Sequence, residues 1–254
     1  MKVDLNSDVG ESFGSFRVGM DERLFNEVTS VNLACGFHAG DFSVMEESVR
    51  LAVQKGVAIG AHPGYPDLQG FGRRAMHFTP KEVYQLVLYQ LGALDAFCRV
   101  HGGIMQHVKP HGALYNEASV NVKVADAIAR AVSDFDDRLI LFGLSGSELS
   151  TAGERAGLCV ASEVFADRTY QADGTLTART KGDALITDAK EAAKRVIQMV
   201  TTGKTTAVDG TIIPLKADTV CIHGDGEDAL LFARTLRGLL LIEGIDIRAV
   251  GEGR

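Results

Sequence analysis

The stretch VNLACGFHAGDFSVME, residues 31–46, contains the pattern that decides the fold of this chain. An apolar run typical of a buried strand leads into a glycine-rich polar loop that carries His38 and Asp41. Ser43 and Glu46 form a capping-box pattern, which predicts that a helix starts there. We expect His38 to face a ligand and Asp41 to help start the helix. A strand, a polar loop and an amphipathic helix in this order make one β/α unit.

The same unit recurs along the chain. Seven strand-like runs lead into polar loops, and they read VDLNSDV, VNLACGF, VAIGAHP, MQHVKPHG, LILFGLSG, CVASEVFA and TVCIHGDG. An eighth run, IDIRAV, has no helix after it. The segment VDGTIIPLKAD is expected to form an extra hairpin or extended excursion before the last core strand, because Asp209-Gly210 is a turn signal.

Two helices besides the one at Ser43 have clear starts. Thr79 is the expected N-cap of one, with Pro80 in its first turn and Glu82 closing a capping box. Ser145 is the expected N-cap of another. The apolar stripes that should face the core are Val83, Leu86, Val87, Leu91 and Leu94 in the first of these helices, and Leu185, Ala189, Ala192, Val196 and Val200 in a later one.

Periodicity alone leaves two α/β architectures open, a doubly wound open sheet and a closed barrel. An open sheet gathers ligands near one switch point, whereas a barrel draws chemistry from nearly every strand end. Polar residues follow almost every strand here: Asn6, Asp8, His38, Asp41, His62, Asp67, Lys109, His111, Glu163, Asp167, Arg168, His223 and Asp225. We therefore predict a single TIM-like (β/α) barrel domain over residues 1–254, seven-stranded or with an incomplete eighth strand.

Composition excludes several classes of function. The net charge is -7 and lysines and arginines are scattered, so no nucleic-acid partner is expected. The amino-terminal residues do not resemble a signal peptide and no apolar run reaches membrane-spanning length, so we expect a cytoplasmic protein without a membrane partner. The four cysteines are widely spaced and should be reduced and mostly buried.

Two short motifs fail on inspection. Gly203-Lys204-Thr205 lacks the earlier glycine of a phosphate-binding loop and follows a helix, so Gly203 is expected to end that helix. The run from Gly143 to Ser147 has serine where a nucleophile elbow needs its second glycine, and Ser145 is better explained as an N-cap.

Histidines gather at the predicted strand ends. A single histidine there is most simply a half-buried ring bonded to a loop carbonyl, but in a barrel His38, His62, His111 and His223 would converge on one mouth. His107 alternates with Lys109 and should lie deeper on the same strand face. Lys109 has a competing interpretation as a surface lysine.

Carboxylates and arginines complete the candidate site. Asp8 is either a turn residue or, with His38 and His62, a ligand of a divalent metal in the barrel mouth. Glu163 is flanked by apolar residues, and partial burial would suit it to acid or base work. Arg168 and the pair Arg73-Arg74 are candidates for holding a substrate carboxylate, with exposed loop arginines as the alternative for Arg73 and Arg74.

Five runs together resemble the LamB/YcsF family over essentially the whole chain: NSDVGESFG, VNLACGFHAGD, IGAHPGYPDLQGFGRR, VKPHGALYN and EVFADRTYQADGTLTART. The resemblance implies a barrel similar to the glycoside hydrolase and deacetylase superfamily. It also implies an ATP-dependent 5-oxoprolinase, in which this chain works with subunits B and C to open 5-oxo-L-proline (pyroglutamate) to L-glutamate. The site residues that it implies are Asp8, His38, His62, Lys109, His111, Glu163, Asp167 and Arg168.

Opening a lactam requires a base, an acid or oxyanion donor, and a group that holds the substrate. We expect Asp8, Lys109, His111 and Glu163 to be catalytic, with Asp8 or Glu163 as the base. Asn6, Arg73, Asp167 and Arg168 are expected to bind substrate. ATP, with Mg, is expected to be handled at least partly by the partner subunits.

Two alternatives remain open at this point. One is a free-standing metal-dependent hydrolase or deacetylase of an N-acyl or carbohydrate substrate, and the other is a non-catalytic regulatory subunit.

Overall fold

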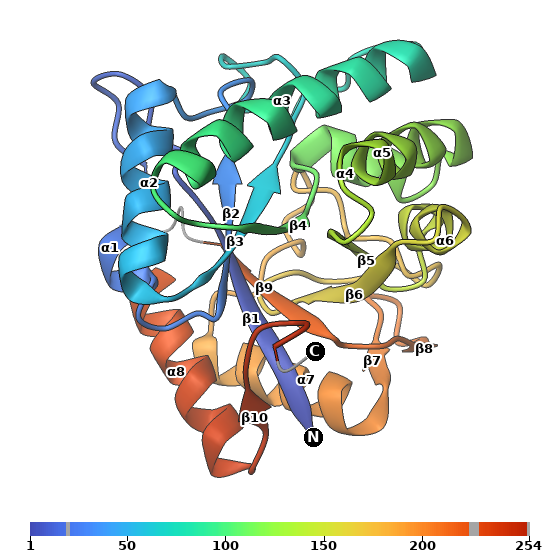
Figure 1. Cartoon of the computed structure of the whole chain (residues 1–254). Helices are drawn as coiled ribbons and strands as arrows, with labels where there is room; N and C mark the ends of the chain where they lie inside the picture. Colours follow the sequence, from blue (N-terminus) through green and yellow to red (C-terminus); the bar gives the residue numbers. More distant parts are fainter. Residues whose placement is uncertain (19–20, 224–228, 253–254) are drawn as a thin grey trace.

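Seven parallel strands close into a barrel with helices packed around it (Figure 1). The computed structural model describes residues 1–18, 21–223 and 229–252. Each strand-like run of the sequence supplies one strand of the barrel, and these are β1 (Lys2–Val9), β2 (Ser30–Ala34), β3 (Ala58–His62), β4 (Met105–Val108), β5 (Ile140–Leu144), β6 (Cys159–Phe165) and β9 (Thr219–His223). The predicted TIM-like barrel is therefore confirmed, in its seven-stranded form. Asp225, expected at the end of the last strand, lies outside the described residues.

β1 closes the barrel, because it pairs with β2 on one side and with β9 on the other. The run expected as an incomplete eighth strand forms β10 (Asp246–Ile247), which pairs only with Lys2 and Val3 at the start of β1. β9 pairs with the following residues of β1, from Asp4 to Asp8. β10 thus pairs with β1 just before the residues that pair with β9, and it is not one of the seven strands that close the barrel.

The helices lie between consecutive strands and cover the outside of the barrel (Figure 1). They are α1 (Asp21–Leu24), α2 (Phe42–Lys55), α3 (Pro80–Val100), α4 (Gly112–Ala118), α5 (Val122–Phe135), α6 (Glu148–Arg155), α7 (Ala189–Thr202) and α8 (Ala229–Ile242). The capping box of α3 forms as predicted, since Thr79 and Glu82 bond reciprocally. The predicted apolar stripe of α3 is buried along its whole length.

Two predicted N-caps are wrong by two residues. Asp41, not Ser43, caps α2, and its carboxylate accepts from the backbone N–H of Val44. Ser147, not Ser145, caps α6. The Ser145 hydroxyl instead accepts from the backbone N–H of Lys216.

Around α7 the predictions hold except at its start. Leu185 precedes the helix and is 47% exposed, so it is not part of the buried face. Gly203 ends α7 in the left-handed conformation, as expected, which rules out a phosphate loop at that place. The predicted hairpin follows, formed by β7 (Lys204–Thr206) and β8 (Ile212–Pro214).

The side chains of β1 show how the sheet divides the core. Leu5 and Val9 belong to the large apolar core between the barrel and its helices. Asn6 and Asp8 alternate with them and bond to polar groups of other strands inside the barrel. The barrel interior is therefore polar at this level.

At the amino ends of the strands the interior is apolar. Ile140, Phe142 and Ala161 form a small separate cluster there, and Val250 packs against it. The side chain of Gln106 fixes this segment by donating to the Val250 carbonyl. The segment after β10 thus fills one end of the barrel, and the polar interior faces the other.

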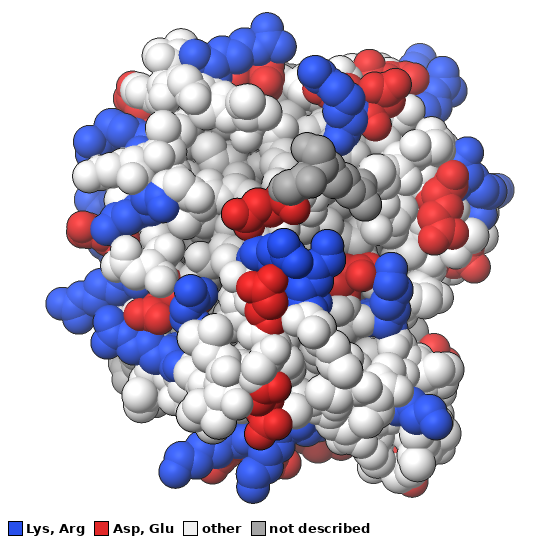
Figure 2. All heavy atoms as spheres, turned by 60° about the horizontal axis from the view of Figure 1, so that its bottom comes forward, with Lys and Arg blue, Asp and Glu red and all other residues white. Residues whose placement is uncertain are grey.

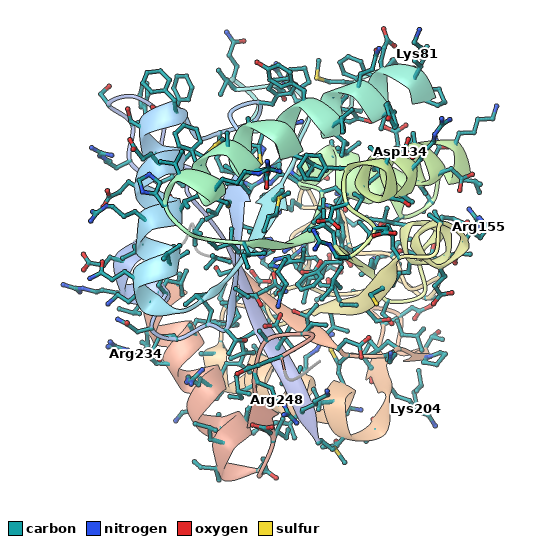
Figure 3. All side chains as sticks on the ribbon, viewed as in Figure 1. Lys81, Asp134, Arg155, Lys204, Arg234 and Arg248 are labelled. Carbon is teal, nitrogen blue, oxygen red and sulfur yellow. The ribbon has the colours of Figure 1, made fainter. Side chains whose placement is uncertain are left out.

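The outer surface carries both signs of charge. Charged side chains of the helices extend outward, among them Lys81, Asp134 and Arg155 (Figure 3). On the face in Figure 2, lysines and arginines are interspersed with acidic residues. In the described ranges no helix is both long and apolar enough to cross a bilayer. Three of the four cysteines are buried, as expected, and Cys159 is exposed.

Candidate functional site

A cavity of about 360 Å³ opens at the carboxyl ends of the strands. Of the predicted site residues, Asp8, His62, Arg73, Lys109, His111 and Arg168 line it, together with Glu11, Tyr115, Arg179 and His223. Asn6, His38, Glu163 and Asp167 do not line it. A cavity of this size suits a small ligand.

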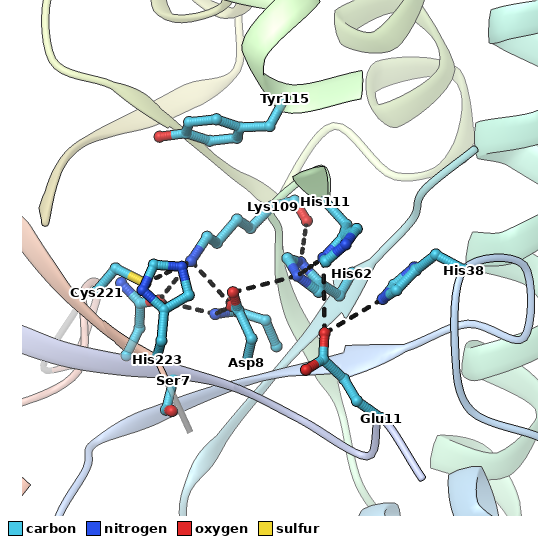
Figure 4. Close-up of polar contacts among 12 residues, drawn as sticks. Ser7, Asp8, Glu11, His38, His62, Lys109, His111, Tyr115, Cys221 and His223 are labelled. Atoms are coloured by element: carbon cyan, nitrogen blue, oxygen red, sulfur yellow. Dashed lines mark hydrogen bonds and ion pairs between the residues drawn. The ribbon is translucent and has the colours of Figure 1, made fainter. Parts of the chain in front are cut away.

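Lys109 lies at the centre of the buried polar network (Figure 4). Its side chain is only 2% exposed, so the alternative of a surface lysine is wrong. Its Nζ lies 2.9 Å from both Asp8 Oδ1 and Glu163 Oε1, 3.1 Å from Asn6 Oδ1 and 3.0 Å from Cys221 Sγ. Burial alone would lower the pKa of Lys109, but the nearby anionic groups outweigh it and hold that pKa well above its usual value. Lys109 is therefore a fixed positive charge.

Glu163 supports Lys109 from below the cavity. It is fully buried, and it accepts from Asn6 Nδ2 at 3.0 Å and from the Tyr115 hydroxyl at 2.6 Å as well as from Lys109. Burial and the Glu163 carboxylate raise the pKa of Tyr115 well above its usual value, so this phenol keeps its proton. Glu163 and Asn6 hold the charged groups in place and do not reach the cavity.

Asp8 faces two neighbours with its two oxygens. Oδ1 accepts from Lys109 and from Asn32 Nδ2, while Oδ2 lies 3.4 Å from His62 Nε2. Burial would raise the pKa of Asp8, but His62 and Lys109 lower it well below its usual value. Asp8 is thus an anion at the floor of the cavity.

Three histidines and one glutamate form a cluster beside Asp8 (Figure 4). His62 donates from Nδ1 to the Lys109 carbonyl at 2.7 Å, and His111 donates from Nε2 to the Phe71 carbonyl at 2.8 Å. The ring of His38 stacks on that of His111 at 3.7 Å between centroids. Glu11 Oε1 lies 3.4 Å from His38 Nε2 and 3.6 Å from His111 Nδ1.

Burial favours the neutral form of two rings in this cluster, those of His38 and His111. It lowers the pKa of His38 and of His111 well below the usual histidine value, and neighbouring imidazoles lower both further. Deeper in the barrel, His107 bonds to Asn32 through Nε2 and stacks on Phe142, as expected from its alternation with Lys109.

The metal ligands predicted from sequence were Asp8, His38 and His62. In the structure the ligand atoms of Glu11, His38, His62 and His111 all lie within 4.8 Å of one another. Asp8 belongs instead to a second such group, with Cys221 and His223. Both ring nitrogens of His38 are buried without a hydrogen bond among the described residues, which fits a role as a metal ligand.

The arginines differ in burial. Arg168 is 5% exposed and donates through Nη2 to the Thr177 carbonyl, while its Nε is buried without a hydrogen bond in the described part of the chain. Burial and nearby Arg179 lower the pKa of Arg168 to about 10. Arg73 is exposed at the cavity rim, over the ring of Phe71. Arg74 pairs with Asp67.

Asp167 does not line the cavity but fixes a residue that does. Its Oδ2 lies 2.7 Å from His223 Nδ1. Burial would raise the pKa of Asp167, but His223 lowers it below its usual value. An aspartate on Nδ1 leaves Nε2 of a histidine as the proton-accepting atom.

Sequence reasoning missed Glu11, Tyr115 and Arg179 as cavity residues. Glu11 follows Asp8 by three residues, just after the end of β1, and Tyr115 lies one helical turn after His111, so both had a local signal. Arg179 lies in the long segment between β6 and α7, where no periodicity points to a site.

Comparison with known proteins gives consistent results. The model of the LamB/YcsF family matches residues 3–254. A protein of Bacillus licheniformis, named as the A subunit of 5-oxoprolinase, is 60% identical over 248 residues, which are 98% of each chain.

Solved structures agree on the fold. The lactam utilization protein from Thermus thermophilus has a TM-score of 0.92 at 49% identity, covering 98% of this chain and 100% of that one. A peptidoglycan deacetylase from Bacillus subtilis has a TM-score of 0.50 at 11% identity, covering 99% of this chain and 88% of that one. The latter likeness concerns the fold alone.

Proposed function

Because the chain belongs to the LamB/YcsF family, we propose that it is the lactam-binding subunit of an ATP-dependent 5-oxoprolinase. With subunits B and C it would hydrolyse 5-oxo-L-proline to L-glutamate. The observation that carries the proposal is the 60% identity, over nearly the whole length of both chains, to a protein named as the A subunit of 5-oxoprolinase. The mouth cavity supports it with groups suited to each part of a small cyclic amino acid.

Arg168 is the best candidate for holding the substrate carboxylate. It lines the cavity, is almost fully buried, and has an Nε–H without a hydrogen bond among the described residues. Leaving such a donor unsatisfied costs about 1–3 kcal/mol, and a substrate carboxylate would remove that cost. Arg73 at the rim and Arg179 add positive charge near the same ligand.

Lys109 is suited to stabilise negative charge on the lactam oxygen. Its position is fixed by acceptors on several sides and its pKa is raised, so it offers a preorganised charge and does not give up its proton. Asp8 beside it can accept a hydrogen bond from the lactam N–H or from the attacking water. Glu163 and Asn6 then act as positioning residues.

His223 is the best candidate for moving the proton. Hydrolysis adds water to the carbonyl carbon and delivers a proton to the nitrogen as the C–N bond breaks. The proton carrier must therefore accept and then donate near neutral pH. His223 lines the cavity and is oriented by Asp167, whereas the lowered pKa of Asp8 makes it a weak base. Both nitrogens of His111 are occupied by the Phe71 carbonyl and by His62.

ATP, with Mg, would raise the electrophilicity of the lactam carbon by transferring its γ-phosphoryl group to the lactam oxygen, with release of ADP. Addition of water to that carbon and cleavage of the C–N bond would then leave an acyl phosphate, which a second water would hydrolyse to glutamate and phosphate. The chain has no glycine-rich phosphate loop, and the nearest match follows the end of α7. We therefore assign nucleotide binding at least partly to the partner subunits.

The test is glutamate formation from 5-oxoproline and ATP, by the chain alone and with subunits B and C. We expect turnover only in the assembled complex. Arg168→Lys should raise KM for 5-oxoproline about tenfold or more, because a lost hydrogen bond to a charged group costs about 1.5–3 kcal/mol. His223→Asn should lower kcat. Arg155→Lys, at an exposed pair on α6, is the matched control and should change neither.

Absence of glutamate from the assembled complex would refute the activity. Normal kinetics of Arg168→Lys and His223→Asn in an intact complex would favour a non-catalytic role for this chain.

The histidine cluster favours a second candidate, a free-standing metal-dependent hydrolase of an N-acyl or carbohydrate substrate. It predicts turnover without ATP or partners that a chelator abolishes, and elemental analysis should then find bound metal.

A further inference from the structure

Two imidazole nitrogens in the mouth, one from His62 and one from His111, face each other at hydrogen-bonding distance. Nδ1 of His62 and Nε2 of His111 each contact a backbone carbonyl, which can only accept, so these nitrogens carry the ring protons. In a neutral ring the other nitrogen then presents a lone pair. Those two nitrogens, His62 Nε2 and His111 Nδ1, lie 2.9 Å apart.

Anionic oxygens approach the same lone pairs. Glu11 Oε1 lies 3.6 Å from His111 Nδ1, and Asp8 Oδ2 lies 3.4 Å from His62 Nε2. Four electron-rich atoms therefore converge in a buried place where like charges are costly unless a cation lies among them. Lys109 pairs with Asp8 through its other oxygen, Oδ1, so this cation does not lie among the four atoms.

We propose that Glu11, His38, His62 and His111 bind one divalent transition-metal ion. The ligands differ from the set expected from sequence, because Glu11 and His111 take the place given to Asp8. Asp8 remains next to His62 as a neighbouring anion. The proposal concerns metal binding alone and stands whether or not the chain opens a lactam.

The distances between the ligand atoms match such an ion. Four ligands about 2.05 Å from a tetrahedral zinc ion lie roughly 3.3 Å from one another. Three of the six separations are near this value, at 2.9 Å for His62 to His111, 3.4 Å for His38 to Glu11 and 3.6 Å for His111 to Glu11, and the other three are within 4.8 Å. The protein therefore holds the donors near their bound positions before any ion arrives.

The surroundings of the ligands are also those of a metal site. Metal-binding histidines commonly donate their second ring N–H to a backbone carbonyl, as His62 and His111 do. Two glycines bring loops against the rings: a Cβ at Gly64 would lie 2.6 Å from His38 Nδ1, and one at Gly72 would lie 2.8 Å from His111 Cδ2. These loops fix the directions of the rings.

The donor set selects the kind of ion. Three imidazoles and one carboxylate suit Zn²⁺, Co²⁺ or Ni²⁺, whereas Mg²⁺ prefers oxygen ligands. The site is therefore distinct from any Mg²⁺ that accompanies ATP. When bound, such an ion would polarise a carbonyl or lower the pKa of a water molecule beside Asp8.

The test is metal binding by the whole chain, freed of metal with a chelator. Titration calorimetry with Zn²⁺ and visible absorption with Co²⁺ should each give one ion per chain at neutral pH, and Mg²⁺ should not compete. Glu11→Gln and His111→Asn should weaken binding tenfold or more, since even residues that merely support ligands contribute about 10–100-fold. His101→Asn, which removes a histidine paired with Glu46 on the outer helices, should bind as wild type.

Nitrogen NMR of the wild-type protein with isotope-labelled histidines tests the ligands without any substitution, so misfolding of a variant cannot affect the result. Zn²⁺ should shift the ring nitrogens of His38, His62 and His111 and leave those of His101 and His107 unchanged. The competing explanation for the short distance between His62 Nε2 and His111 Nδ1 is a single proton shared by the two nitrogens. A protein that shows that shared proton and binds neither Zn²⁺ nor Co²⁺ stoichiometrically would overturn the proposal, as would unchanged affinity in both ligand variants.

Discussion

At the scale of single residues, the most consequential side chain is Lys109. It is buried between two carboxylates, which share its single positive charge. A buried ion pair adds little net stability over apolar packing, but removing one partner leaves an uncompensated charge. The same contacts that hold Lys109 for chemistry therefore make the fold depend on it.

Lys109→Met should destabilise the protein by about 3–5 kcal/mol, because Asp8 and Glu163 would remain buried without their cation. Urea denaturation followed by circular dichroism measures this loss. The double variant Lys109→Met with Glu163→Gln removes one of the stranded charges and should recover part of it. A double variant less stable than Lys109→Met alone would contradict this account.

At the scale of elements, the approach of β3 to β4 depends on the absence of a side chain. A Cβ at Gly60 of β3 would lie 2.1 Å from Nε2 of His107 on β4. His107 uses that nitrogen to bond Asn32 of β2. Because Gly60 has no side chain, the ring of His107 can pass β3 and form a buried hydrogen bond with Asn32 of β2.

Gly60→Ala should cost about 3 kcal/mol or more, because it overpacks the barrel interior and displaces the His107 bond. Gly92→Ala is the matched control, since a Cβ there meets nothing within 4 Å and the residue lies inside α3. That change should stabilise the protein by up to about 1 kcal/mol, because alanine is the better helix former. Thermal or urea denaturation of the two variants compares them, and equal stabilities would refute the packing argument.

Strands and helix starts could be predicted from the sequence where the residues that determine them are close together along the chain. Apolar runs that lead into polar loops located all seven barrel strands, and the capping box located the start of α3. The cap of α2 was misplaced because two overlapping patterns, at Asp41 and at Ser43, are both acceptable locally. In the structure Asp41 has extended backbone and its carboxylate accepts from the Val44 N–H, so the helix begins at Phe42 and Ser43 lies inside it.

At the scale of the whole molecule, the convergence of histidines was predictable but their partners were not. Strand ends of a barrel meet at one mouth, so His62 and His111 could be placed there from sequence. That their lone pairs face each other depends on the register of β3 against β4, which shifts between Ile59 and Gly60. Glu11 lies in the loop after β1, where its closeness to Asp8 along the chain was the one signal and no periodic pattern supported it.

The free energy of unfolding of the whole chain should depend on pH because of Asp4. Burial raises its pKa to about 6, although hydroxyls of Thr219, Thr29 and Ser30 lower it in part. Between about pH 4 and 6 the folded protein then keeps a proton that the unfolded chain has released. The contribution of Asp4 to the free energy of unfolding therefore falls as pH rises through this window and is constant above it.

Asp4→Asn lacks this titration. From pH 4 to pH 7 its stability relative to wild type should improve by about 3 kcal/mol, the equivalent of a shift of about two pKa units. Urea denaturation of both proteins across this range measures the difference. A difference independent of pH would show that Asp4 does not titrate in this way.

The apolar end of the barrel limits the route by which substrate and product enter and leave the cavity. Val250 and the cluster of Ile140, Phe142 and Ala161 fill the interior at the amino ends of the strands. In the described part of the chain, substrate and product must therefore pass through the same opening, at the carboxyl ends. A companion protein covering that opening would govern both arrival and departure, and an activated lactam could be handed over only across that contact. The order in which the subunits engage would then set the order of the chemical steps.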